Sequence, residues 1–131
     1  MTNRDLYPRL AYEDEEVAVV WLSRVFGFKE ATRKDSLIWL ELGGNVVMVS
    51  SAAYGLKSPR QRGGTSNKVN VYVDNVDAHY ERAKAEGAVI ERPLETMPWG
   101  DRRYEAFDLE GHWWHFAQRV PEDRDDLVVH R

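Results

Sequence analysis

Apolar and polar residues alternate along most of this chain, and the alternation changes to a helical spacing in two segments. Strict alternation is the pattern of a half-buried strand, and turn residues such as Asp35 and the pair Gly43-Gly44 separate the alternating runs. The pattern predicts short strands over residues 6–12, 28–33, 36–42, 45–51, 69–73, 88–92, 102–108 and 112–118.

The two segments with helical spacing also carry the start and stop signals of helices. Asp14 can cap the first helix and Gly27 can end it. The apolar face of this helix is predicted to consist of Val17, Val20, Trp21 and Val25. The second helix is predicted to start at Asp74 or Asn75 and to end at Gly87. Its apolar face is predicted to consist of Val76, Tyr80 and Ala83.

Both halves of the chain follow the order strand, helix and three strands, which indicates an internal duplication. A shift of sixty residues places Tyr12 on Tyr72 and Asp14 on Asp74. Each half is too small to bury its own sheet, so we expect the two halves to pair. The sequence therefore predicts an α+β fold of two paired β-α-β-β-β units, which form a curved, cup-shaped mixed sheet with the helices outside and a cleft within.

We expect a single domain in which the two units cover about residues 5–51 and 67–118. Residues 52–66 form the linker, and residues 119–131 form a charged C-terminal tail. The linker is rich in Gly and Pro and is the most positive segment of the chain. It is either a solvated connection or a loop over a site, where its cations would clamp an anion.

The last predicted hairpin carries large side chains on both faces. Alternation places Trp114 and Phe116 on one face and Trp113 and His115 on the other. A hairpin with one wet face would not carry aromatic residues on both. We expect one face to pack on helices and the other to line a concave surface.

Composition narrows the class of protein. The chain has 131 residues, no Cys and a net charge of -4. It therefore has no disulfide framework, no thiolate metal site and no Cys nucleophile. The mildly acidic balance disfavours a nucleic-acid partner, and no apolar run is long enough to span a membrane. By default we expect a cytoplasmic globular domain.

Three stretches of the chain resemble the vicinal oxygen chelate superfamily, which includes glyoxalase I, bleomycin-resistance proteins and extradiol dioxygenases. They are Phe26–Phe28 (FGF), Val73–Asn75 (VDN) and, above all, Trp99–Ala117 (WGDRRYEAFDLEGHWWHFA). Leu109 stands where the family usually has proline. The resemblance covers nearly the whole chain and is closest to the small glyoxalase-like and PhnB-like members. It implies the paired-unit fold more specifically than it implies any activity.

The resemblance also implies four positions for the ligands of a divalent metal ion, one on the first and one on the last strand of each unit. These positions correspond to Tyr7, Met48, Lys68 and His115. Only His115 is an ordinary ligand, because a lysine ammonium repels a metal ion and a thioether is a soft, weak ligand. We therefore predict that the metal site of the family is absent and that the protein has no cofactor.

The candidate ligand-binding residues include three tryptophans and several polar side chains of the predicted cleft. They are Tyr7, Trp39, Met48, Lys68, Asn70, Trp99, Arg103, Trp113 and His115. The tryptophans would hold a flat organic ligand, or else close a small core or a dimer interface. Lys68 would bind an anion, pair with Glu41 or Glu105, or lie in solvent. Alternation places Arg103 and Glu105 on one face.

The leading hypothesis is a metal-independent protein that binds a small organic, partly aromatic ligand in this cleft. The alternative is a lyase, isomerase or dioxygenase of the same superfamily, either metal-dependent or metal-free. In the metal-free case His115 would be the catalytic acid–base, and otherwise it is a packed, hydrogen-bonded histidine. A third possibility is an interaction module whose cleft is filled by its own side chains. The resemblance also implies a homodimer with clefts at or across the interface.

Overall fold

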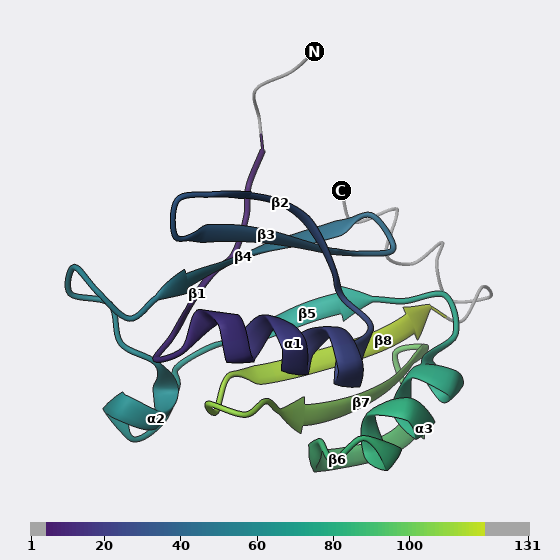
Figure 1. The fold of residues 1–131 in the computed structure, drawn as a ribbon. Helices are drawn as coiled ribbons and strands as arrows, with labels where there is room; N and C mark the ends of the chain where they lie inside the picture. Colours follow the sequence, from purple (N-terminus) through teal and green to yellow (C-terminus); the bar gives the residue numbers. More distant parts are fainter. Residues whose placement is uncertain (1–4, 120–131) are drawn as a thin grey trace.

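The computed structural model describes residues 5–119 and contains two β-α-β-β-β units joined by a short helix (Figure 1). The elements of the first unit are β1 (Arg9–Tyr12), α1 (Glu15–Phe26), β2 (Lys29–Lys34), β3 (Leu37–Leu42) and β4 (Asn45–Ser51). Helix α2 (Pro59–Arg62) lies in the linker. The elements of the second unit are β5 (Lys68–Tyr72), α3 (Val76–Ala85), β6 (Val89–Thr96), β7 (Asp101–Phe107) and β8 (Trp113–Arg119).

Each unit forms a four-stranded mixed sheet of the same topology. The strand orders are β1-β4-β3-β2 and β5-β8-β7-β6, and in each sheet the first and last strands of the unit pair in parallel. The predicted α+β class and the two paired units are confirmed. The sheets remain separate, because no ladder joins β1 to β5 within residues 5–119. No helix in this part of the chain has the length and apolar character that crossing a membrane requires.

The predicted helix boundaries agree with the structure because the capping residues act as expected. The Asp14 carboxylate accepts a hydrogen bond from the Val17 amide at 3.1 Å, and Gly27 takes the left-handed conformation with a φ of 84°. Asn75, one of the two residues proposed, caps α3 by accepting from the Ala78 amide at 3.0 Å.

The predicted apolar face of α1 was correct at Val25, which is buried, and in part at Trp21, which packs against the core, but it was wrong at the exposed Val17 and Val20. The buried residues of this helix are Ala18, Leu22, Val25 and Phe26. Val20, which we expected in the core, is 66% exposed, and Trp21 is only partly buried. Residues 17–22 are apolar on nearly every side, so their spacing did not determine which face turns inward. Strand β1 is also shorter than predicted, because Pro8 precedes it.

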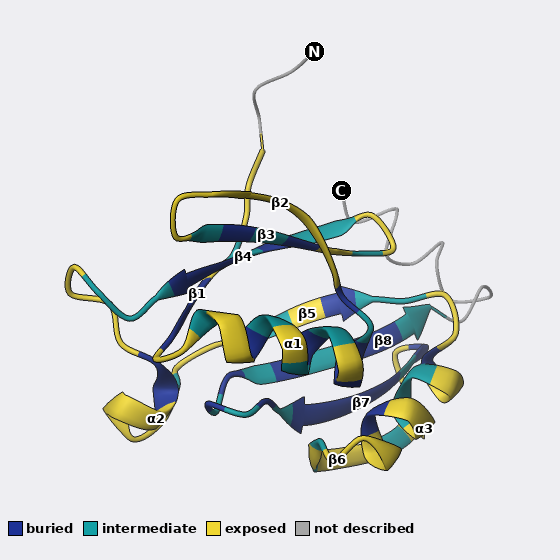
Figure 2. Cartoon of the chain, viewed as in Figure 1, coloured by how far each residue is buried: buried dark blue, intermediate teal, exposed yellow. Residues whose placement is uncertain are grey.

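The two units share one buried core, in which α1 of the first unit packs on β8 of the second (Figure 2). The ring of Phe26 lies 5.5 Å from that of Trp114 and 4.7 Å from that of Phe116 between centroids. All three side chains are fully buried. Each sheet therefore turns one face to the common core, and the opposite face is called here its outer face.

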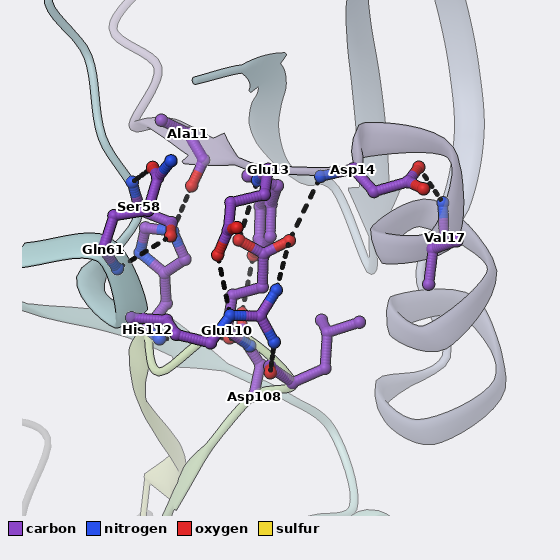
Figure 3. A network of polar contacts seen from close by, with 12 residues as sticks. Ala11, Glu13, Asp14, Val17, Ser58, Gln61, Asp108, Glu110 and His112 are labelled. Carbon is purple, nitrogen blue, oxygen red and sulfur yellow. Dashed lines mark hydrogen bonds and ion pairs between the residues drawn. The ribbon is translucent and has the colours of Figure 1, made fainter.

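A buried carboxylate in the loop between β7 and β8 fixes the two units together (Figure 3). Asp108 Oδ2 accepts hydrogen bonds from the Tyr12 hydroxyl at 2.6 Å and from Trp114 Nε1 at 3.0 Å. Asp108 Oδ1 accepts from the amides of Glu110 and His112, each at 3.0 Å. One side chain thus shapes its own turn and anchors β1 of the other unit.

The same loop holds the junction between β1 and α1. Glu110 accepts from the Glu13 amide at 2.7 Å and from the Asp14 amide at 3.3 Å. His112 Nε2 lies 2.8 Å from the carbonyl oxygen of Ala11, to which it donates. The segment 108–112, conspicuous in the sequence for its D-L-E-G-H motif, is therefore a structural clamp between the units.

The linker is ordered by the same clamp. Ser58 and Gln61 form a capping box at α2, and the Arg60 amide donates to the Glu110 carbonyl at 2.9 Å. Pro59 and Ser58 are buried. The linker is therefore not solvated along its whole length: Ser58 and Pro59 are buried, whereas residues 60–62 are exposed.

Candidate functional site

The outer face of the second sheet carries polar and aromatic side chains, whereas its inner face is apolar. Along β7, Tyr104 and Ala106 point into the core, so Arg103 and Glu105 point outward. Along β8, Trp114 and Phe116 are in the core, so Trp113 and His115 point outward. The two-sided hairpin expected from the sequence is therefore present, with its helix-covered face confirmed.

Glu105 is the centre of this outer face. Its carboxylate is buried, at 2% exposure for the residue, and it accepts hydrogen bonds from side chains of three other strands. Oε1 accepts from Trp113 Nε1 at 2.9 Å and from Arg92 Nε at 3.2 Å. Oε2 accepts from Lys68 Nζ at 3.1 Å and from His115 Nδ1 at 2.8 Å. The five residues, Lys68, Arg92, Glu105, Trp113 and His115, are called the Glu105 cluster below.

Strand register explains why these residues meet. Glu105 lies opposite His115 in the β7–β8 ladder and opposite Arg92 in the β6–β7 ladder. Lys68 lies opposite Trp113 in the β5–β8 ladder. Directly opposed residues bring their Cβ atoms within about 5.5 Å, so these side chains share one face at contact distance.

The cations keep Glu105 ionised although it is buried. Burial by itself raises the pKa of this carboxyl group, but the hydrogen bonds from His115 and Lys68 and the charge of Lys68 outweigh burial. The net result is a Glu105 pKa below its ordinary value. One negative charge thus lies beneath two permanent positive charges, and the exposed part of the cluster is cationic.

An aromatic surface adjoins these cations. The ring of Trp113 lies 5.2 Å from that of Phe107, and Lys68 Nζ lies 4.4 Å from the Trp113 ring centroid. Because Glu105 is ionised, His115 Nδ1 carries the hydrogen of their bond, so a neutral His115 has its lone pair on Nε2. No hydrogen bond to His115 Nε2 is found within the described part of the chain.

The other predicted site residues of the second unit lie outside this cluster. Arg103 points to the same face but donates to the Pro93 carbonyl at 2.9 Å and pairs with Glu95 at 3.5 Å. Asn70 is exposed opposite His115 in the β5–β8 ladder. Trp99 is 57% exposed in the turn between β6 and β7.

The predicted residues of the first unit form a separate group. Trp39 and Met48 face each other in the β3–β4 ladder on the outer face of the first sheet. Tyr7 precedes β1 and, with Asn70, lines a hollow of about 370 Å³ between the two units. Within residues 5–119 no hydrogen bond, ion pair or aromatic contact joins Trp39 or Met48 to Trp113 or His115.

The four positions implied for a metal ion do not fit one. The Lys68 ammonium and His115 Nδ1 are both bonded to the same Glu105 oxygen. Tyr7 and Met48 offer no imidazole or carboxylate. Nowhere between residues 5 and 119 do three His, Cys, Asp or Glu side chains gather as metal ligands.

Two residues of the cluster were missed as site residues in the sequence. Glu105 was considered as one of two possible partners of Lys68 and as a neighbour of Arg103 on one face, and its pairing with Lys68 is confirmed at 3.1 Å. Arg92 was missed because β6 was predicted to end there, whereas β6 continues through Pro93 to Thr96 as an edge strand with irregular register.

Comparison with known proteins places the chain among proteins of one fold. The family model described as the Glyoxalase/Bleomycin resistance protein/Dioxygenase superfamily matches residues 7–116. An uncharacterized protein of Mycobacterium bovis is 33% identical over 134 residues, which cover 94% of this chain and 88% of that protein.

Two solved structures extend this comparison. TioX from Micromonospora sp. ML1 is 39% identical, with a TM-score of 0.74 over 87% of this chain and 94% of TioX. The fosfomycin resistance protein FosX from Listeria monocytogenes, solved with Mn(II) and a sulfate ion, has a TM-score of 0.69. FosX is only 16% identical, over 98% of this chain and 99% of FosX, so it shares the fold alone.

Proposed function

The chain belongs to the glyoxalase/bleomycin resistance protein/dioxygenase superfamily, and within it we propose that the protein binds a small organic ligand without a metal ion. The ligand would lie on the outer face of the second sheet, against Trp113, Lys68 and His115. The observation that carries this proposal is the buried Glu105, which holds all three side chains in place.

The chemistry of the Glu105 cluster indicates the kind of ligand. Trp113 and Phe107 offer aromatic rings to a flat apolar group. Lys68 and Arg92 carry two positive charges, and the single Glu105 carboxylate neutralises only one of them. We therefore expect a flat molecule with an anionic group, rather than the cationic compound that the acidic composition alone would favour.

A second candidate function is acid–base catalysis without a metal, as in a lyase or isomerase. It is supported by the 2.8 Å contact between His115 Nδ1 and Glu105 Oε2. A carboxylate at Nδ1 fixes the ring and the tautomer, so Nε2 is available to take a proton from a ligand. In this case Glu105 would be a positioning residue and His115 the catalytic residue.

We also propose that the protein is a homodimer in which a second copy closes the site. Trp39, Met48 and Val46 form a half-buried apolar strip on the outer face of the first sheet, bordered by the exposed Glu41 and Arg9. A solvated sheet face is usually polar, so this apolar strip with a polar border suits a partner surface. If the first sheet of one copy faces the second sheet of the other, the two groups of predicted site residues form one cleft.

Tryptophan fluorescence tests the ligand proposal directly. Aryl carboxylates are titrated into the wild type, Trp113→Leu, His115→Ala and, as the matched tryptophan control, Trp99→Leu. We expect binding that is weakened in the first two variants and unchanged in the control. Saturable binding that is insensitive to Trp113 and His115 would place the ligand elsewhere, and no binding of any acid would favour an interaction module.

Metal content tests metal independence in the same preparations. Protein purified without chelator is offered nickel, zinc, manganese and iron, and metal per chain is measured. We expect no retained metal. Near-stoichiometric metal that is lost in His115→Ala would contradict the proposal and lead to chelating substrates instead.

A further inference from the structure

A second hollow of the molecule lies beside the linker, and its lining residues Asn67 and His112 directly precede Lys68 and Trp113 of the Glu105 cluster. It has a volume of about 540 Å³ and is lined by β1, the linker and His112. This volume is within the range of small-molecule sites, roughly 300–1,000 Å³. From its charge and shape we propose that this linker hollow binds a small organic dianion, a phosphate monoester or a dicarboxylate.

The charge of the lining supports an anion. Arg9, Lys57 and Arg62 line the hollow, and none of its lining residues is Asp or Glu, although the chain as a whole has a net charge of -4. In the part of the chain that the structure describes, these three cations form no ion pair, and Arg9 donates only to the Ser50 hydroxyl at 3.2 Å. Neighbouring Arg60, by contrast, is bonded to Glu13 at 2.7 Å.

The linker is held firmly enough to present these cations. The Arg60 amide is bonded to the Glu110 carbonyl, and the buried Pro59 packs against Gly111 so closely that a Cβ there would lie 3.2 Å from Pro59 Cβ. A pre-ordered loop does not need to be immobilised on binding, which favours affinity. The clamp of residues 108–112 therefore holds the backbone segment between Lys57 and Arg62.

Other groups of the lining fit the remainder of such a ligand. The Thr65 hydroxyl lies 2.9 Å from Asn67 Oδ1, to which it donates, so the Asn67 amide group remains to donate to an oxyanion. Leu56 and Leu10 provide an apolar wall beside the cations. A phosphate or carboxylate carried on a small apolar body matches this combination.

Nuclear magnetic resonance with phenyl phosphate as the probe tests the inference. We expect amide shifts in residues 57–67 and affinity that falls about tenfold or more in the double variant Lys57→Gln/Arg62→Gln, because charge-assisted bonds are lost. The matched control is Lys29→Gln/Lys34→Gln, which removes the same charge from β2, at the opposite edge of the first sheet. Phthalate is titrated in parallel to separate dicarboxylates from phosphate esters, with phenol as the neutral comparison.

Equal weakening in the control variant would overturn the site, because it would show a general effect of charge. Shifts confined to Lys68, Trp113 and His115, or binding of phenol as tight as that of phenyl phosphate, would also overturn it. Unfolding midpoints of all variants establish that each is folded. Shifts in residues 57–67 report binding in the linker hollow, whereas shifts at Trp113 and His115 report the Glu105 cluster, so this inference and the proposed function can fail separately.

Discussion

Tyr12 and Tyr72 occupy equivalent places in the two units, and each donates its hydroxyl hydrogen to an aspartate at 2.6 Å. The two bonds differ in their surroundings. Tyr12 is fully buried and its partner Asp108 also lies in the clamp, whereas Tyr72 is only partly buried beside Asp101. Burial, with the charge of Asp108 acting in the same direction, raises the Tyr12 pKa well above its ordinary value.

Replacing each tyrosine by phenylalanine removes one hydroxyl and little else. A hydrogen bond to a charged group contributes roughly 1.5–3 kcal/mol, and the buried Asp108 Oδ2 would keep only its bond from Trp114 Nε1. We expect Tyr12→Phe to lower the free energy of unfolding by about 2 kcal/mol, which corresponds to roughly 8 °C in Tm for a chain of this size. Water can replace the hydroxyl at the partly open Tyr72 site, so Tyr72→Phe should cost about 0.5 kcal/mol.

Urea unfolding, monitored by tryptophan fluorescence, measures the free energy of unfolding of both variants. The comparison is valid if the dependence of this free energy on urea concentration is the same as in the wild type. The internal equivalence makes each variant the control of the other, since the chemistry and the bond length are the same. Equal losses in the two variants, or a loss below about 0.5 kcal/mol for Tyr12→Phe, would refute the argument that burial in the clamp determines the contribution.

Two further predictions concern acid stability and assembly. Burial, with the charge of Arg82 in the same direction and against the hydrogen bond to the Phe26 carbonyl, lowers the pKa of His79 to about 4. As the pH falls, the unfolded chain therefore protonates this histidine at a higher pH than the folded chain does. The free energy of unfolding, unaffected above the ordinary histidine pKa, should fall by about 3 kcal/mol as the pH drops from 6.5 to 4. Urea unfolding of the wild type and His79→Gln over this range tests this, and the same pH dependence in both proteins would contradict it. For assembly, we expect light scattering to show that Trp39→Arg converts the dimer to a monomer. Val20→Arg, on the exposed side of α1, should remain a dimer, and the reverse result would place the interface on α1 instead.

The sequence predicted the fold well where local signals and tertiary packing agree. Strand β4 was predicted at its observed bounds, because a β-branched run is preceded by the turn at Gly43-Gly44. Helix α1 was predicted from its caps, but its inward face was predicted only in part, since Val25 is buried and Val20 is exposed. Nothing local distinguishes Val20 from Leu22; only the position of β8 in the other unit does.

The linker carries a local sequence signal for helix α2. Ser58 and Gln61 have the spacing of a capping box with Pro59 at the first helical position, and together they predict the short helix α2. A four-residue helix is too short for hydrophobic periodicity, so the capping pattern was the only local evidence for it.

The candidate site could be predicted only in part. Alternation correctly placed Trp113 with His115 on one face of β8, and Arg103 with Glu105 on one face of β7, because the side-chain period of a strand is two. The sequence does not contain the register of β5 and β6 against this hairpin, and register is what brings Lys68 and Arg92 to Glu105. Binding of a ligand and pairing of two copies remain predictions for both outer faces.

The clamp of residues 108–112 also bears on how the protein is made. Its contacts with Ala11 and Tyr12 join positions that lie 101 and 96 residues apart in the chain. At about 5–20 residues per second, a ribosome needs roughly 3–12 s to go from the end of β4 to this loop. During that time Tyr12 lacks its hydrogen-bond acceptor and α1 lacks the β8 surface that covers Phe26. The first unit is therefore synthesised early but completed last.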